Sequence, residues 1–152
     1  MYSAFIAIHS LLRWVVLLAG LAAVGRGIGG WSGRPWLPAD RLTGRIFVGV
    51  VDLQFLIGLV LYVVLSPMVG AAMSNVGAAM RDPILRFFLV EHAAGMLVAV
   101  ALAHVGQSRI KKATDDTRRH RTAAVFFGLS LFIILLSIPW PGMPAGRPLW
   151  PW

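Results

Sequence analysis

The sequence contains no cysteine and has few charged residues. Without cysteine, disulfide bonds, thiolate metal ligands and iron–sulfur clusters are excluded. Charged residues make up 13% of the 152 residues, whereas hydrophobic residues make up 58%. A soluble domain carries about twice that charged fraction. This shortage of charge argues against an ordinary soluble domain and predicts one integral membrane domain covering residues 1–152.

Acidic residues are especially scarce, with 6 Asp and Glu against 14 Lys and Arg, for a net charge of +8. The basic residues cluster between apolar runs, a pattern typical of the positive-inside rule, and we therefore expect no nucleic-acid partner. Phosphate-binding loops, catalytic triads, paired carboxylates and zinc-ligand clusters are missing from the sequence. The sequence therefore carries no signature that is typical of a stand-alone enzyme.

Four long apolar runs are present. They cover about residues 3–24, 46–65, 87–106 and 123–140, followed by a tail at 141–152. Each is close to the roughly 20 residues that a helix needs to cross a bilayer, and no alternating pattern typical of a membrane barrel recurs. The first run lacks the flanks of a cleaved signal peptide, so we expect a retained helix. The predicted fold class is all-α, an integral membrane four-helix bundle.

The distribution of basic residues predicts the orientation of this bundle. Ten of the fourteen Lys and Arg lie after the first and third apolar runs. The positive-inside rule places these linkers in the cytoplasm and both termini on the outer, periplasmic side of a bacterial inner membrane. Residues 66–86 would then form an outer segment, which we expect to be a surface loop before a helix that begins at Pro83. This segment could instead lie flat on the membrane or cover a pocket.

Two histidines lie at the same predicted depth. A helix rises about 1.5 Å per residue, which places His9 and His92 each about 7 Å to the outer side of the midplane. Two histidines at one level on two helices of a bundle suit axial ligation of a haem iron. Gly95 and other small residues follow His92 at helical spacing and would leave room for a porphyrin face. Small residues also let membrane helices pack closely, which is the alternative explanation.

Arg13 lies one turn deeper than His9 and needs a partner inside the membrane. Asp52 is the first expected partner, Glu91 is the competitor, and a haem propionate is a third candidate. Arg86 lies on the outer side, where we expect it near the propionate edge, while Arg13 would stabilise the floor of the site.

The remaining histidines are expected to have other roles. His104 is predicted to be hydrogen-bonded within the bundle, or to join Asp52 in a proton or quinone path. His120 lies in the basic stretch TRRHRT and is predicted to face solvent or lipid headgroups.

Three short motifs carry a resemblance to known proteins. They are IHSLLRW (Ile8–Trp14), RFFLVEH (Arg86–His92) and IPWP (Ile138–Pro141). With these motifs the chain resembles a family of short, four-span bacterial membrane proteins that are commonly labelled "cytochrome b". The resemblance implies a b-type haem, with His9 and His92 at the motif positions that could hold it.

Two functions of different classes follow from these features. The first is a membrane haem b protein for electron transfer, in which two histidine ligands leave no open iron position. The alternative is a cofactor-free accessory or structural subunit of a larger respiratory or photosynthetic complex, with its polar residues used for packing. A transporter is less favoured because broken helices and inverted repeats are missing. Expected partners are the lipid bilayer, other membrane subunits or a homodimer, and a quinone.

Overall fold

The computed structural model describes residues 1–150, so the last two residues of the predicted tail lie outside the described part. Four helical segments are long and apolar enough to cross a membrane, which confirms the predicted all-α membrane fold. The segments are α1 (Tyr2–Gly29); α2 (Pro38–Val60) with η1 (Leu61–Leu65); α5 (Pro83–Arg86), η2 (Phe87–Glu91) and α6 (His92–Lys112); and α7 (Asp116–Ser137).

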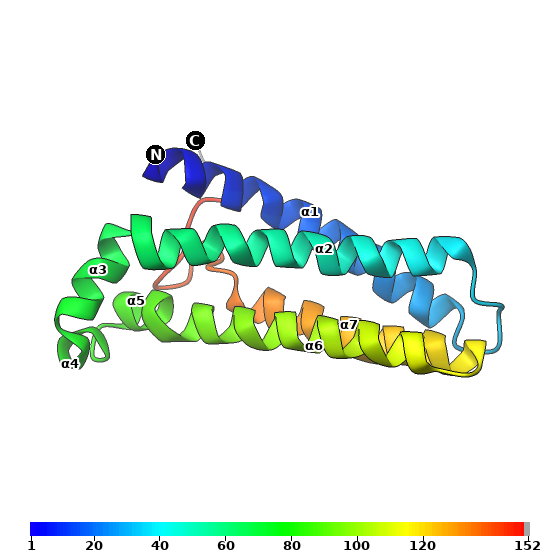
Figure 1. Cartoon of the computed structure of the whole chain (residues 1–152). Coiled ribbons are helices and arrows are strands. Elements are labelled where there is room, and N and C mark those ends of the chain that lie inside the picture. The colour runs from blue at the N-terminus through cyan, green and yellow to red at the C-terminus, as the bar shows by residue number, and fades with distance from the viewer. Residues whose placement is uncertain (151–152) are drawn as a thin grey trace.

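The four long helices form a closed ring in which each has two neighbours. Helix α1 packs against α2 and α7, and α6 packs against α7 and α2 (Figure 1). The side chains of Phe47 and Phe127 are completely buried and meet edge to face in the middle of the bundle. Apolar side chains such as Leu18 and Leu56 are exposed on the outside, as a lipid-facing surface requires.

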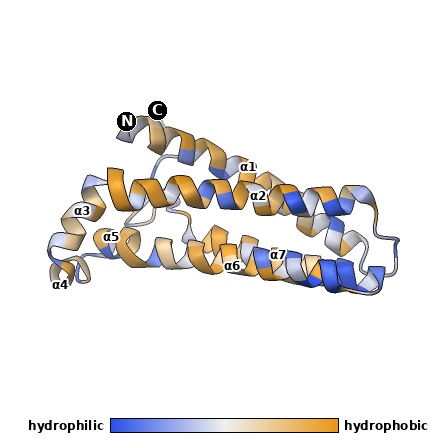
Figure 2. Ribbon diagram, viewed as in Figure 1, coloured by the Kyte–Doolittle hydropathy of each residue, from blue (hydrophilic) through white to orange (hydrophobic). Residues whose placement is uncertain are grey.

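The two ends of the bundle differ in charge. The basic end carries the linkers at residues 30–37 and 113–115, and the adjoining helix turns are hydrophilic (Figure 2). The terminal end carries the N-terminus, the described part of the tail up to residue 150, and the short helices that follow α2 (Figure 1). The two basic linkers thus share one end of the molecule.

The helices extend past the predicted apolar runs at the basic end. Helix α1 continues to Gly29, and α2 begins at Pro38, where the backbone N–H of Leu37 donates to the Asp40 side chain over 2.8 Å. Helix α7 starts at Asp116, and the Asp115 side chain accepts from a backbone N–H. Arginines and other polar residues are readily accommodated in a helix at the membrane surface, so the helices are longer than the apolar runs.

The predicted surface loop at residues 66–86 is wrong, because this segment is largely helical. It forms α3 (Pro67–Ser74) and α4 (Val76–Ala79) before α5. The side chains of Ser66, Asn75 and Asp82 each accept a backbone N–H at the start of one of these helices. Such caps replace the hydrogen bonds that a helix start lacks, and the start at Pro83 is confirmed.

Two π-helical segments lie at the terminal end. Segment η1 ends with the backbone N–H of Ser66 donating to the Leu61 carbonyl, five residues earlier, over 2.8 Å. Segment η2 ends directly before His92, and the Tyr62 hydroxyl donates to the Leu89 carbonyl within it over 2.7 Å. Single π turns are frequent at functional sites because they change the direction in which the following side chains point. Segment η2 therefore helps set the direction of His92.

Candidate functional site

His9 and His92 meet inside the terminal half of the bundle. Their ring centroids are 6.3 Å apart, and the ring planes make an angle of 68°. Helix α2 contributes Gly58, where an added Cβ would lie 3.1 Å from Cε1 of His9. Helix α7 contributes Ser137, which contacts His92. All four long helices therefore converge on this histidine pair.

The hydrogen bonds of the two rings differ. Nδ1 of His92 lies 2.7 Å from the backbone carbonyl of Ser137. Because a carbonyl only accepts, Nδ1 carries the hydrogen, and Nε2 keeps a free lone pair in the neutral ring. Nδ1 of His9 is buried and has no hydrogen-bond partner among residues 1–150. The pair thus offers nitrogen atoms that the described protein groups do not use.

Aromatic side chains surround His92. The ring centroid of Phe87 lies 5.9 Å from that of His92, and the centroid of Phe88 lies 6.4 Å away. Phe87 is itself buried. On α2, the Gln54 side-chain amide donates to the His9 backbone carbonyl over 3.0 Å. The histidines therefore lie in an apolar surrounding that is anchored to α2.

Arg13 is buried, but the predicted pairing with Asp52 is wrong. Its Nη2 donates to the backbone carbonyl of Leu149 in the tail over 2.6 Å. Asp52 instead lies 2.7 Å from Nε2 of His104. Depth along a helix gives the level of a side chain but not its direction around the helix axis, and the two side chains point to different neighbours.

Arg86 and Glu91 form an ion pair of 2.7 Å, with 43% and 47% of their side chains exposed. Glu91 is therefore not the partner of Arg13. Its carboxylate already forms an ion pair with Arg86. Of the two arginines assigned to the predicted haem site, Arg13 is the one with no carboxylate partner in the described part of the chain.

Gly95 lies against α7 rather than toward His9. A Cβ at Gly95 would overlap the Ser137 hydroxyl. Further along the same face, Ala99 and Ala103 are completely buried, and the Ser130 hydroxyl donates to the Ala99 carbonyl over 2.8 Å. The stripe of small residues thus packs α6 against α7, the alternative that the sequence left open.

The other two histidines have clear surroundings. His104 and Asp52 form the hydrogen-bonded pair already described, with 54% and 38% of their side chains exposed. His120 is 0% exposed, so the prediction that it faces solvent or headgroups is wrong. Its ring contacts Trp36 edge to face at 4.8 Å, and a Cβ at Gly30 would overlap it. The absence of a side chain at Gly30 makes the space that buries His120.

A buried carboxylate at the basic end was not predicted. Asp40 is 2% exposed and accepts from Nε of Arg26 over 2.7 Å and from Nη2 of Arg34 over 2.8 Å. The hydrogen bond to Asp40 raises the pKa of Arg34 above its ordinary value. The sequence does contain a signal for this ion pair, because Asp40 is the first acidic residue along the chain and three arginines precede it.

Within the described residues, the donor set of the site is limited to the two histidines. Residues 1–150 contain no group of three or more metal-ligating side chains. Two histidines are sufficient for a haem, because the porphyrin supplies the other four iron ligands. Comparisons with protein-family models, with curated proteins and with solved structures found no match to this chain. The resemblance to proteins labelled "cytochrome b" therefore stays a prediction.

Proposed function

We propose that this chain is a membrane protein that holds a b-type haem between His9 and His92 and transfers single electrons. The observation that supports this best is the separation of the two rings. A metal ion bonded at about 2 Å to one nitrogen of each imidazole puts the ring centroids about 6 Å apart. The observed 6.3 Å agrees with this spacing. When bound, haem supplies one-electron redox chemistry at an iron without an open position.

Residues of the chain would orient the two ligands. The Ser137 carbonyl fixes Nδ1–H of His92, which leaves Nε2 for a metal, as is usual for ligating histidines. The buried Nδ1 of His9 lacks a partner in residues 1–150, so this ring is the less constrained of the two. Phe87 and Phe88 keep water away from His92. A dry surrounding favours electron transfer over exchange of ligands.

Arg13 would provide positive charge beside the site. It lies one turn from His9 on α1, is 8% exposed and bonds to a neutral carbonyl of the tail. A buried arginine without a carboxylate retains the capacity to stabilise a negatively charged group. A haem propionate is such a group. We therefore assign the propionate contact to Arg13 in preference to Arg86.

The proposed location is a bacterial inner membrane, with the basic end in the cytoplasm and the haem nearer the outer surface. The position of both basic linkers at one end supports this orientation through the positive-inside rule. Electrons would pass between a membrane quinone and a protein partner.

A second candidate function is that of a cofactor-free subunit in a larger membrane complex. The Asp52–His104 pair favours it, because both side chains are more than one-third exposed on the outside of α2 and α6. Polar groups are costly against lipid, so another subunit or a second copy of the chain would shield them. In this reading the contact between His9 and His92 serves packing alone.

A pyridine haemochrome assay, which measures haem content, and the visible absorption spectrum of the untreated protein together separate the two functions. The chain is expressed with ample haem and purified, and the haem bound per chain is measured. We expect one haem per chain in the wild type, and loss of the low-spin spectrum in His9→Ala and His92→Ala. His104→Ala is the matched control, because it removes an exposed histidine from the same helix as His92 and should leave the spectrum unchanged.

Two outcomes would contradict the haem proposal. A folded wild-type protein without haem would leave the subunit function as the better account. An unchanged spectrum in either His9→Ala or His92→Ala would show that the ligands lie elsewhere. Far-UV circular dichroism on each variant confirms that the bundle is still folded.

A further inference from the structure

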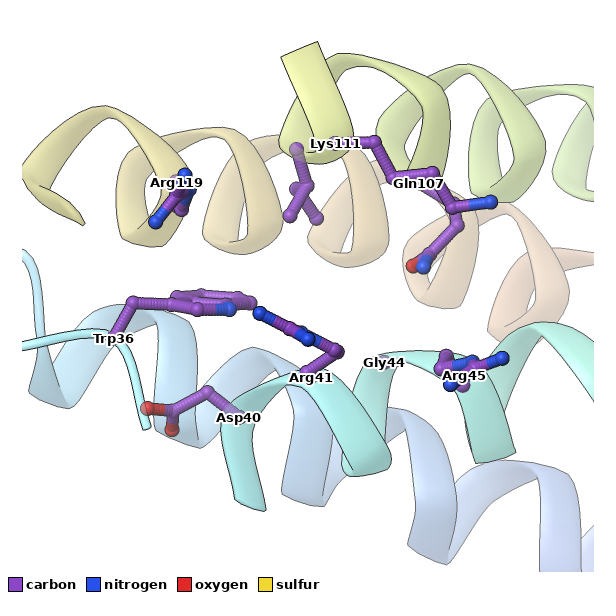
Figure 3. Close-up of a pocket in the computed structure, with 9 residues that line it drawn as sticks. Trp36, Asp40, Arg41, Gly44, Arg45, Gln107, Lys111 and Arg119 are labelled. Atoms are coloured by element: carbon purple, nitrogen blue, oxygen red, sulfur yellow. The ribbon is translucent and has the colours of Figure 1, made fainter. Parts of the chain in front are cut away.

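A cavity of about 320 Å³ opens at the basic end between α2, α6 and α7. Figure 3 shows Arg41 pointing from α2 into the gap, and Gln107 pointing into it from α6 on the other side. The remaining lining comes from Trp36, Asp40, Gly44, Arg45, Ile110, Lys111 and Arg119. The volume lies in the range of small-ligand sites, about 300–1,000 Å³. The cavity is distant from the histidine pair, which lies in the terminal half of the bundle.

Positive charge in this cavity exceeds negative charge. Four of its lining residues are cationic, Arg41 and Arg45 from α2, Lys111 from α6 and Arg119 from α7. Arg119 pairs with Asp116 at 2.9 Å. No ion pair forms at the other three within residues 1–150.

Asp40 is the one carboxylate that residues 1–150 contribute to the lining, and it is already paired with two arginines. Arg26 and Arg34 each donate to it within 2.8 Å, and the Leu37 backbone N–H donates to its second oxygen. In Figure 3 its carboxylate points away from Arg41. Arg41, Arg45 and Lys111 therefore share a cavity in which no free carboxylate from the described part of the chain balances their charge.

We propose that this cavity binds the phosphate group of an anionic membrane lipid. Guanidinium groups match phosphate oxygens through paired N–H donors, and a lysine adds a point charge. Gln107 offers an amide donor, and Trp36 provides the amphipathic ring that favours the membrane interface. Basic pockets between membrane helices are typical sites for phosphate-bearing lipid headgroups.

The surface beside the cavity favours a lipid over a free phosphate ion. Leu42, Ile46 and Leu53 are 57%, 46% and 49% exposed on α2, and their spacing places them on one face of the helix. This apolar face begins next to Arg41 and Arg45 and runs toward the middle of the membrane. Acyl chains of a lipid could lie along it while the phosphate occupies the cavity.

Native mass spectrometry of the detergent-purified chain tests the proposal. Phosphatidylglycerol, phosphatidylcholine and inorganic phosphate serve as separate probes. We expect retention of phosphatidylglycerol well above phosphatidylcholine. The triple variant Arg41→Gln, Arg45→Gln and Lys111→Gln should weaken phosphatidylglycerol binding about tenfold or more, because each cation contributes to binding of an anionic headgroup. The three side chains are exposed, so their removal leaves the core intact.

A charge-matched variant is the control. Lys112→Gln, Arg118→Gln and Arg121→Gln remove three charges from the same end of the bundle but do not line the cavity. We expect this variant to change phosphatidylglycerol binding by less than about threefold. The single change Arg41→Gln provides a milder test if the triple variant is poorly folded, and it should still weaken binding.

Three outcomes would overturn the inference. Equal weakening in both triple variants would show that only overall charge matters. Equal retention of both lipids would exclude headgroup recognition. Inorganic phosphate that displaces phosphatidylglycerol at equal concentration would show a site for the free ion instead of a lipid. The haem content of these variants is independent of all three results.

Discussion

Helix α1 approaches α7 so closely at Gly27 that this position tests the packing of the bundle. A Cβ at Gly27 would lie 2.7 Å from the backbone N and 3.0 Å from the Cα of Ala124. Ordinary van der Waals contact begins at about 3.4 Å, and backbone atoms cannot rotate away as a flexible side chain can. The alanine variant Gly27→Ala must therefore push α1 and α7 apart along their contact.

The size of the effect follows by comparison with Gly25, two residues earlier on the same helix. A Cβ at Gly25 meets nothing within 4 Å. Replacing glycine by alanine inside a helix stabilises it by about 1 kcal/mol, a gain that both variants share. Overpacking costs about 1–3 kcal/mol and applies to Gly27→Ala alone. We therefore expect Gly27→Ala to be about 1–3 kcal/mol less stable than Gly25→Ala.

The measurement is unfolding by SDS in mixed micelles, followed by far-UV circular dichroism. Gly25→Ala should unfold at the same or a higher SDS fraction than the wild type, and Gly27→Ala should unfold at a lower fraction than Gly25→Ala. If the two variants unfold at the same SDS fraction, the close approach of α1 and α7 at Gly27 is refuted.

Three further predictions use the same unfolding assay. Asp40→Asn should lower the free energy of unfolding by about 2–3 kcal/mol, because it removes a buried carboxylate from two arginines that water partly solvates. Glu91→Gln breaks an exposed ion pair and should lower it by less than about 1 kcal/mol. Asp52→Asn and His104→Gln should show a coupling energy of about 0.2–1 kcal/mol in a double-mutant cycle. Arg13→Leu and Asp52→Asn should be additive, because these side chains have separate partners, and a coupling above about 1 kcal/mol would restore the rejected pair.

The membrane fold was predictable because it depends on simple quantities. The length of each apolar run gives the spans, and the clustering of arginine and lysine identifies the basic linkers. The helices that replace the loop at 66–86 were harder to predict. Their caps at Ser66, Asn75 and Asp82 are visible in the sequence, but the small residues between them resemble those of a flexible loop.

The site was predictable only in part. Helical rise predicts one level for His9 and His92, and the structure puts their rings 6.3 Å apart. The same calculation failed for Arg13, since its partner is a backbone carbonyl that no residue type reveals. His120 was predicted incorrectly because its neighbours in sequence are basic, whereas its burial depends on Gly30 and Trp36 from a distant linker.

The bond between Arg13 and Leu149 joins two residues that are 136 positions apart, and this spacing affects how the protein is made. A ribosome finishes the first span long before it reaches the tail. During insertion Arg13 therefore enters the bilayer without the carbonyl that later accepts its hydrogen bond, at a cost of about 2.5–3.5 kcal/mol on the insertion scale. The strongly apolar residues around Arg13 must carry the span into the membrane against that cost. Nascent chains halted before the tail is made would then have a first helix that is retained less securely than in the finished protein.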